Sequence, residues 1–126
     1  MGPPGTINSQ PWSTRIVTSA GSKPVTSSTY YVLLALADAD RHGVGIGDEV
    51  RRRTDGIVEL GPGTLYATLS KMLDRGLIAQ IDAPVEGDDP RRRYYSITEG
   101  GREALSYETH RLSVVLHAAR SKGIAE

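Results

Sequence analysis

Residues 61–78 carry the signals that start and stop one helix, and this stretch constrains the fold most. Pro62 suits the first helical position, because the N–H that proline lacks would have no partner inside the helix there. Gly76 suits the left-handed position just beyond a helix C-terminus. An apolar stripe runs between these two ends and consists of Leu65, Leu69, Met72 and Leu73. The stretch therefore predicts a helix held on a core by one face.

The opposite face of this predicted helix carries small, hydroxylic or basic side chains, with Tyr66 at its margin. These side chains are Thr64, Ala67, Thr68, Ser70, Lys71 and Arg75. Such a face can approach a large surface closely and donate hydrogen bonds to it. The working hypothesis is a DNA recognition helix, because one helix fits the DNA major groove. The candidate DNA-contacting residues of this helix are Gly63, Thr64, Tyr66, Ala67, Ser70 and Lys71.

Length and composition predict one small globular domain without disulfides. The chain has 126 residues and no cysteine, which excludes thiolate metal sites and thiol catalysis. Its longest strongly apolar run, residues 30–37, is too short to span a bilayer, and no secretory signal is evident. We therefore expect no membrane association, and the absence of cysteine fits a reducing compartment. The formal net charge is zero, but two arginine runs, residues 51–53 and 91–93, still allow a local basic surface.

The first half of the chain predicts a tail, two helices and a short strand. Residues 1–27 are rich in Gly, Pro, Ser and Thr and are expected to form a disordered or arm-like tail. Ser27 or Ser28 can cap a helix over 29–40 that is apolar on all sides, which predicts cover by a second subunit at Tyr31 and Leu34. A helix over 46–54 and a strand over 57–60 follow. The arginines at 51–53 favour pairing with the helix dipole, with phosphate contact as the alternative.

The second half predicts a β-hairpin and a long helix. Strands over 77–82 and 91–97 flank a polar loop over 83–89. On the second strand, Arg92 and Tyr94 are expected to face one side, and the neighbouring residues the other. Thr98 then caps a helix over 99–122 whose apolar seam is predicted to mediate dimerisation. The seam consists of Leu105, Leu112, Val115, Leu116 and Ala119.

The order of these elements predicts a mainly α fold with a small β-hairpin. Residues 28–98 are expected to form a winged helix-turn-helix, and residues 99–126 a C-terminal dimerisation helix. The hairpin can place Arg91, Arg92 and Arg93 against backbone phosphates or in the adjacent minor groove.

Several of these residues together resemble the PadR family of transcriptional regulators. The resemblance covers about residues 28–110 and rests on the apolar first helix, the His42-Gly43 turn, the segments 61–66 and 69–78, the wing strand 91–98 and Gly101-Arg102. It implies a cytoplasmic homodimer that binds a pseudo-palindromic operator in double-stranded DNA, usually as a repressor. It also implies dimerisation through the first and last helices, and a small-molecule effector bound near that interface.

Two other function classes remain beside this one. A winged helix can act as a protein-interaction module without DNA. A metal-responsive sensor is a further alternative, in which His42, His110 and His117 would ligate metal across subunits. An enzyme is not expected, because the sequence has no phosphate-binding glycine loop, no cysteine nucleophile and no recognisable acid–base pair. No catalytic residue, metal site or cofactor is therefore assigned.

Overall fold

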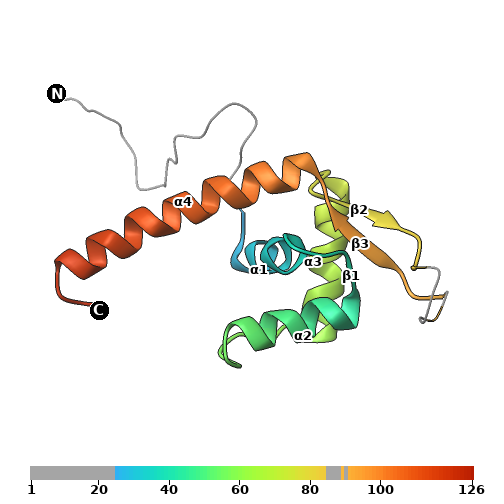
Figure 1. Cartoon of the computed structure of the whole chain (residues 1–126), viewed down its shortest axis with the longest axis horizontal. Coiled ribbons are helices and arrows are strands. Elements are labelled where there is room, and N and C mark those ends of the chain that lie inside the picture. The colour runs from blue at the N-terminus through green and yellow to red at the C-terminus, as the bar shows by residue number, and fades with distance from the viewer. Residues whose placement is uncertain (1–24, 85–88, 90) are drawn as a thin grey trace.

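The chain folds as four helices and one three-stranded antiparallel sheet within residues 25–84, 89 and 91–126, the part that the computed structural model describes (Figure 1). The elements are α1 (Ser27–Leu36), β1 (Arg41–His42), α2 (Gly43–Arg53), α3 (Pro62–Asp74), β2 (Ile78–Ile81), β3 (Tyr94–Ile97) and α4 (Glu99–Ser121). The strand order is β1-β3-β2. The predicted class, a winged helix-turn-helix followed by a long C-terminal helix, is confirmed.

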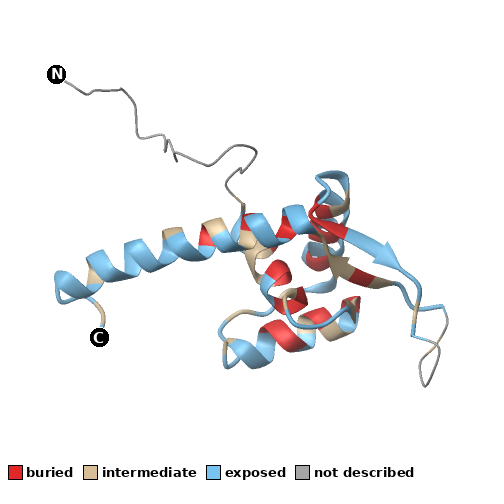
Figure 2. Cartoon of the chain, turned by 45° about the horizontal axis from the view of Figure 1, so that its top comes forward, coloured by how far each residue is buried: buried red, intermediate tan, exposed pale blue. Residues whose placement is uncertain are grey.

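The core lies where α1, α2 and α3 meet beneath the first half of α4, with the sheet at one end (Figure 1). Leu33, Leu36, Ile46, Leu69 and Met72 are each exposed by 1% or less. The second half of α4 extends beyond this body, and nearly all of it is exposed (Figure 2).

Helix α3 has the ends that its sequence predicted. Pro62 occupies its first turn, and Gly76 takes the left-handed conformation with φ +74°. The amide of Gly76 donates to the carbonyl of Leu73, and the amide of Leu77 donates to that of Met72. These two bonds form a Schellman motif, which satisfies carbonyls that the helix end leaves open.

Helix α1 is shorter than predicted and begins earlier. Its cap is Thr26, whose hydroxyl accepts a hydrogen bond from the Thr29 amide at 3.3 Å, in place of Ser27 or Ser28. The helix ends at Leu36, although the sequence predicted residue 40. After it, the Arg41 side chain donates to the carbonyl of Ala35 at 2.7 Å, so the chain reverses to enter β1.

Helix α2 begins three residues before the predicted start at residue 46. The His42 ring caps it, because His42 Nδ1 accepts a hydrogen bond from the Gly45 amide at 3.1 Å. The predicted strand over 57–60 is wrong, since these residues form no strand. The third strand of the sheet is instead β1, which pairs Arg41 with Tyr95 and His42 with Tyr94.

The hairpin strands are shorter than the sequence predicted. Strand β2 spans Ile78–Ile81, and β3 spans Tyr94–Ile97. Residues 91–93 precede β3, so the second strand begins three residues later than predicted. Arg92 and Tyr94 nevertheless both contact His42, in agreement with their expected placement on one side. Part of the predicted loop over 83–89, and the predicted tail up to residue 24, lie outside the described residues.

Helix α4 begins against the start of β2, and one glycine permits the close approach. Thr98 caps the helix as predicted, since its hydroxyl accepts from the Gly101 amide at 3.0 Å. A Cβ added at Gly101 would overlap the Leu77 carbonyl oxygen and lie 2.8 Å from Ile97 Cγ1. The first of these neighbours is backbone, which cannot move aside as a flexible side chain can.

We therefore predict that Gly101→Ala lowers the free energy of unfolding by about 1–3 kcal/mol or more, the range for forcing atoms into a packed site. Gly100→Ala is the matched control, because its Cβ would lie 3.6 Å from the nearest atom, an ordinary contact. Denaturant unfolding of both variants measures the difference. Equal stability of the two variants would contradict this account of the packing between α4 and β2.

Candidate nucleic-acid interface

The outer face of α3 is exposed at every predicted contact position. Its apolar stripe is turned inward, with Leu65, Leu69 and Met72 buried. Thr68, which the helical pattern placed on the outer side, is buried instead at 8% exposure. The exposed positions are Gly63, Thr64, Tyr66, Ala67, Ser70 and Lys71. The face is thus small and hydroxylic, with one basic residue at its C-terminal end.

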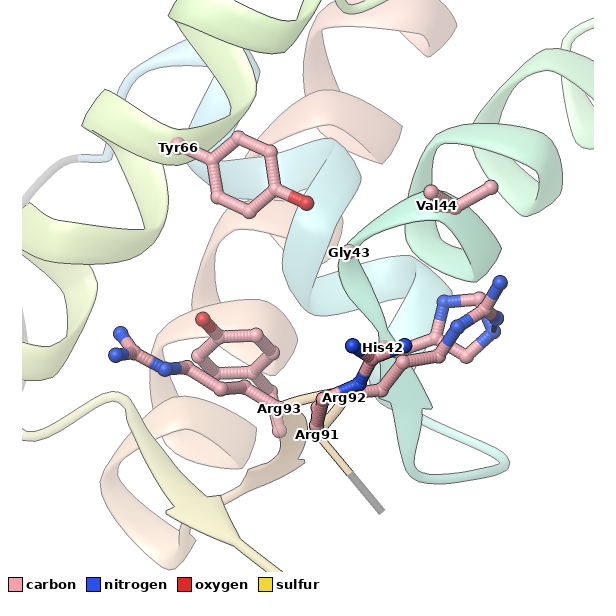
Figure 3. Close-up of a pocket in the computed structure, with 8 residues that line it drawn as sticks. His42, Gly43, Val44, Tyr66, Arg91, Arg92 and Arg93 are labelled. Carbon is pink, nitrogen blue, oxygen red and sulfur yellow. Dashed lines mark hydrogen bonds between the residues drawn. The ribbon is translucent and has the colours of Figure 1, made fainter. Parts of the chain in front are cut away.

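Tyr66 lies at the boundary between α3 and α2. Half of its surface is exposed, and its hydroxyl points toward the first turn of α2 (Figure 3). A Cβ at Gly43 would overlap the Tyr66 hydroxyl oxygen and lie 2.9 Å from the adjacent ring carbon. The absence of a side chain at Gly43 therefore lets the Tyr66 ring pack close to α2 while one edge stays at the surface.

A groove of about 360 Å³ opens beside this tyrosine, between α2, α3 and the base of the wing. In Figure 3 the Arg93 side chain extends toward α3, whereas Arg92 lies against His42 on the other side. The lining contains no acidic residue among those that the structure describes. It consists of His42, Gly43, Val44, Tyr66, Arg91, Arg92, Arg93 and Tyr95.

The three wing arginines differ in their partners. Arg91 is held by Asp89, with its Nε 3.1 Å from Oδ1 and its Nη2 3.0 Å from Oδ2. This hydrogen bonding holds the pKa of Asp89 below its ordinary value. Arg92 Nη1 lies 2.6 Å from His42 Nε2, and Arg93 makes no ion pair with a described residue. All three arginines line the groove, with Arg91 bound to Asp89 and Arg92 beside His42.

The other arginine run, at the end of α2, is paired with acidic side chains. Arg52 and Arg53 both bind the carboxylate of Glu49, which is 3% exposed, and Arg53 Nε lies 2.7 Å from Oε2. Arg51 lies 2.6 Å from Asp48. The hydrogen bond from Arg53, followed by the charge of Arg41, holds the pKa of Glu49 below its ordinary value of 4.5. These pairs favour a structural role for the run, with acidic side chains as partners where the sequence predicted the helix dipole.

The residues predicted to mediate dimerisation fall on two helices that lie against each other. Tyr30 of α1 and Thr109 of α4 share a hydrogen bond of 3.0 Å between their hydroxyls. The most exposed members of the set are Leu34 at 42%, Leu112 at 39%, Val115 at 53% and Leu116 at 43%. The partly buried members are Tyr31, Leu105 and Ala119. In one chain the set is therefore a partly uncovered apolar surface.

The three histidines do not come together within one chain. His42 caps α2, while His110 and His117 are exposed on α4. In the part of the chain that the structure describes, no group of three or more His, Cys, Asp or Glu residues is placed to hold a metal ion.

Four groove residues, His42, Gly43, Val44 and Tyr95, were not predicted as DNA contacts. The sequence contained one signal for His42, since a polar residue before a helical segment can act as its cap. His42 is not among the strongest capping residue types, and the following Gly-Val-Gly suggested a break. The third strand, which fixes His42 beside Tyr94, depends on pairing with a segment about fifty residues away.

Comparison with known proteins identifies the relatives of this chain. Residues 32–107 match the model of the transcriptional regulator PadR-like family. Transcriptional regulator Rv3488 of Mycobacterium tuberculosis is 33% identical over 82 residues, which make up 65% of this chain and 72% of that protein. An uncharacterized 37.1 kDa protein in transposon TN4556 of Streptomyces fradiae is 32% identical over 82 residues, 65% of this chain but only 22% of that protein.

Solved structures share the fold at lower identity. A PadR family transcription regulator from hypervirulent Clostridium difficile R20291 superposes with a TM-score of 0.68 at 23% identity, covering 76% of this chain and 97% of that one. Bacillus subtilis PadR, solved in complex with operator DNA, gives a TM-score of 0.54 at 20% identity, covering 62% of this chain and 44% of that one.

Within the described residues, no helix is both long and apolar enough to cross a membrane.

The arginine pairs around Glu49 generate a prediction. Glu49→Gln should lower the free energy of unfolding at pH 7 by about 1–3 kcal/mol, the cost of disrupting a buried hydrogen-bonded group. Because the pKa of Glu49 is lowered in the folded state, its stabilisation is complete above about pH 4.5 and is lost as the pH falls through the folded-state value. Wild type and variant should therefore converge in stability in acid.

Denaturant unfolding at a series of pH values measures this convergence. Glu59→Gln is the control, because Glu59 is 70% exposed and lies 3.8 Å from Arg51. A stability difference for Glu49→Gln that stays constant from pH 7 into acid would show that the ionised carboxylate is not the stabilising group.

Proposed function

Because this chain belongs to the PadR-like family of transcriptional regulators, we propose that it is a sequence-specific DNA-binding regulator, acting in the cytoplasm as a homodimeric repressor rather than as an enzyme. The observation that carries the proposal is the exposed outer face of α3 beside the basic groove at the wing base. A DNA major groove about 12 Å wide admits one helix, and base edges are read there by short polar and basic side chains.

In this arrangement each set of residues has one task. Thr64, Ser70 and Lys71 on α3 face the base edges or the phosphates that flank them. Arg92 and Arg93 contact the phosphate backbone at the wing, where contacts position the protein without reading sequence. Arg91 joins them by leaving Asp89. Tyr66 and Gly63 form the rest of the proposed contact surface of α3. The small side chain of Ala67 permits close approach of this helix to DNA.

The proposed dimer rests on the continuation of one side of α4. Gly101, Ala104 and Glu108 are buried against the body of the same chain. Four, seven and eleven residues after Glu108, the same side of the helix carries Leu112, Val115 and Ala119, with Leu116 beside them. This part of α4 extends beyond the rest of the folded chain (Figure 2). A second copy related by a two-fold axis would cover this side and the exposed Leu34, and it would match a pseudo-palindromic operator.

A cavity of about 140 Å³ between α1 and α4 supports the proposed response to a small effector. Tyr30, Tyr31 and Leu112 line it, together with Glu108 and Arg111. Both Nε and Nη2 of Arg111 bond Glu108 Oε2, at 2.9 and 2.5 Å, and Oε1 is left without a hydrogen-bond partner among the described residues. An effector carrying a hydrogen-bond donor would satisfy that oxygen at the edge of the proposed dimer surface.

The DNA-binding proposal predicts the effect of two sets of substitutions. Lys71→Ala and the pair Arg91→Ala with Arg92→Ala should each weaken binding to a duplex that the wild type selects from a random pool. For every phosphate that a variant no longer neutralises, the slope of log affinity against log salt should fall by about 0.9. Fluorescence anisotropy at several salt concentrations measures both quantities, and thermal unfolding should change little because these side chains are exposed.

Arg51→Ala is the matched control for these substitutions, because Arg51 is exposed but paired with Asp48. It should leave the salt slope unchanged. The assignments of α3 and the wing would both be overturned if Lys71→Ala and the double substitution bound DNA as the wild type does.

The dimer proposal predicts that Leu116→Glu produces monomers. A charge at a residue 43% exposed in one chain is tolerated in a monomer but is costly inside an apolar interface. Sedimentation velocity should show the variant as a monomer at concentrations where the wild type is a dimer. His117→Glu is the control, since this exposed residue lies about 100° further around the helix. A wild type that remains monomeric at every concentration would contradict the proposal.

A further inference from the structure

We propose that His42 and Arg92 together bind a single phosphate of the DNA backbone, so that the residue capping α2 also binds the duplex. This inference rests on the proposed function and adds a specific ligand to it. It starts from an incompatibility between the two hydrogen-bond partners of one imidazole ring.

The cap fixes the tautomer of His42. Its Nδ1 accepts the hydrogen bond of the Gly45 amide at 3.1 Å, and a neutral imidazole has one acceptor nitrogen and one N–H. The hydrogen of the ring therefore lies on Nε2. The other tautomer would let Nε2 accept from Arg92, but it would turn an N–H on Nδ1 toward the Gly45 amide and leave the helix cap unmade.

Two donors consequently face each other on one side of the groove. His42 Nε2 lies 2.6 Å from Nη1 of Arg92, and a guanidinium has donors only. The two groups cannot satisfy one another in this tautomer. An oxygen atom has several lone pairs. If it lies beside both groups, it can accept one hydrogen bond from the imidazole N–H and another from the guanidinium.

The surroundings favour an anionic acceptor. Among the described residues, the groove is lined by three arginines and no acid, and it opens beside the exposed face of α3 (Figure 3). The His42 ring is held in place by its cap and by an edge-on contact with Tyr94, with ring centroids 5.3 Å apart. A phosphodiester oxygen is charged, accepts more than one hydrogen bond and repeats along the DNA backbone next to any helix in the major groove. This chemistry points to a backbone phosphate rather than a base.

Substitutions that retain the cap separate capping from phosphate binding. Asparagine is among the best N-cap residues, so His42→Asn should keep the melting temperature while it removes the imidazole N–H. Affinity for the selected duplex should fall about tenfold, the scale of a lost hydrogen bond to a charged group. His42→Asp should weaken binding further, because its carboxylate caps the helix and repels phosphate. Lys122→Ala, an exposed position beyond α4, should have no effect.

Neutral methylphosphonate links, placed one at a time along the duplex, identify the phosphate. We expect one position at which a methylphosphonate link lowers the affinity of the wild type but does not lower the affinity of His42→Asn or of Arg92→Ala. The double variant should lose less than the product of the two single losses, because both residues act on one group.

Three outcomes overturn the inference. Wild-type affinity in His42→Asn would remove His42 from the interface and leave the proposed function intact. If His42→Asn and Arg92→Ala became insensitive to methylphosphonate at different positions, and their losses of affinity were independent, the two residues would contact separate phosphates. Failure of the wild type to select any duplex would refute the proposed function, and the shared phosphate site with it.

Discussion

The packing of one side of α3 against the core determines where every other functional feature lies. Leu65, Leu69 and Met72 are buried, and a helix with one side fixed has its other side fixed as well. The small polar residues between 63 and 71 must therefore face outward. The short connections to α2 and β2 then place the wing base and the start of α2 at the edges of that exposed face. The exposed face of α3 is thus a consequence of core packing.

Ion pairing inside the chain explains how a neutral protein presents a local basic surface. Glu49 and Asp48 engage the arginines at the end of α2, and Asp89 engages Arg91. Lys71 and Arg93 have no ion-pair partner among the described residues, and Arg92 Nη1 lies 2.6 Å from His42 Nε2. The two arginine runs are alike in sequence but differ in their neighbours. Their roles therefore follow from which acids the fold brings beside them.

Local patterns predicted α3 and the start of α4, because the signals for both lie within a few residues of the helix ends. Pro62, Gly76 and Thr98 act on the backbone next to them, and their effects do not depend on the rest of the fold. Strand β1 could not be predicted in this way, since two residues gain strand geometry only by pairing with Tyr94 and Tyr95. The same distant pairing places His42 in the groove. The exposed positions of α3 followed from helical periodicity, whereas the differing partners of the wing arginines depended on loop geometry.

In the proposed function, specific DNA binding requires two copies of α3 to face one duplex. A single exposed helix with small side chains offers few contacts, and in the proposed dimer the uncovered side of α4 pairs two such helices. Hydroxyl-radical footprinting on a duplex selected by the wild type tests this most directly. We predict two symmetric protected tracts whose centres lie about one helical turn, 10–10.5 base pairs, apart or a multiple of it. One unpaired tract, or protection without a centre of symmetry, would contradict the account.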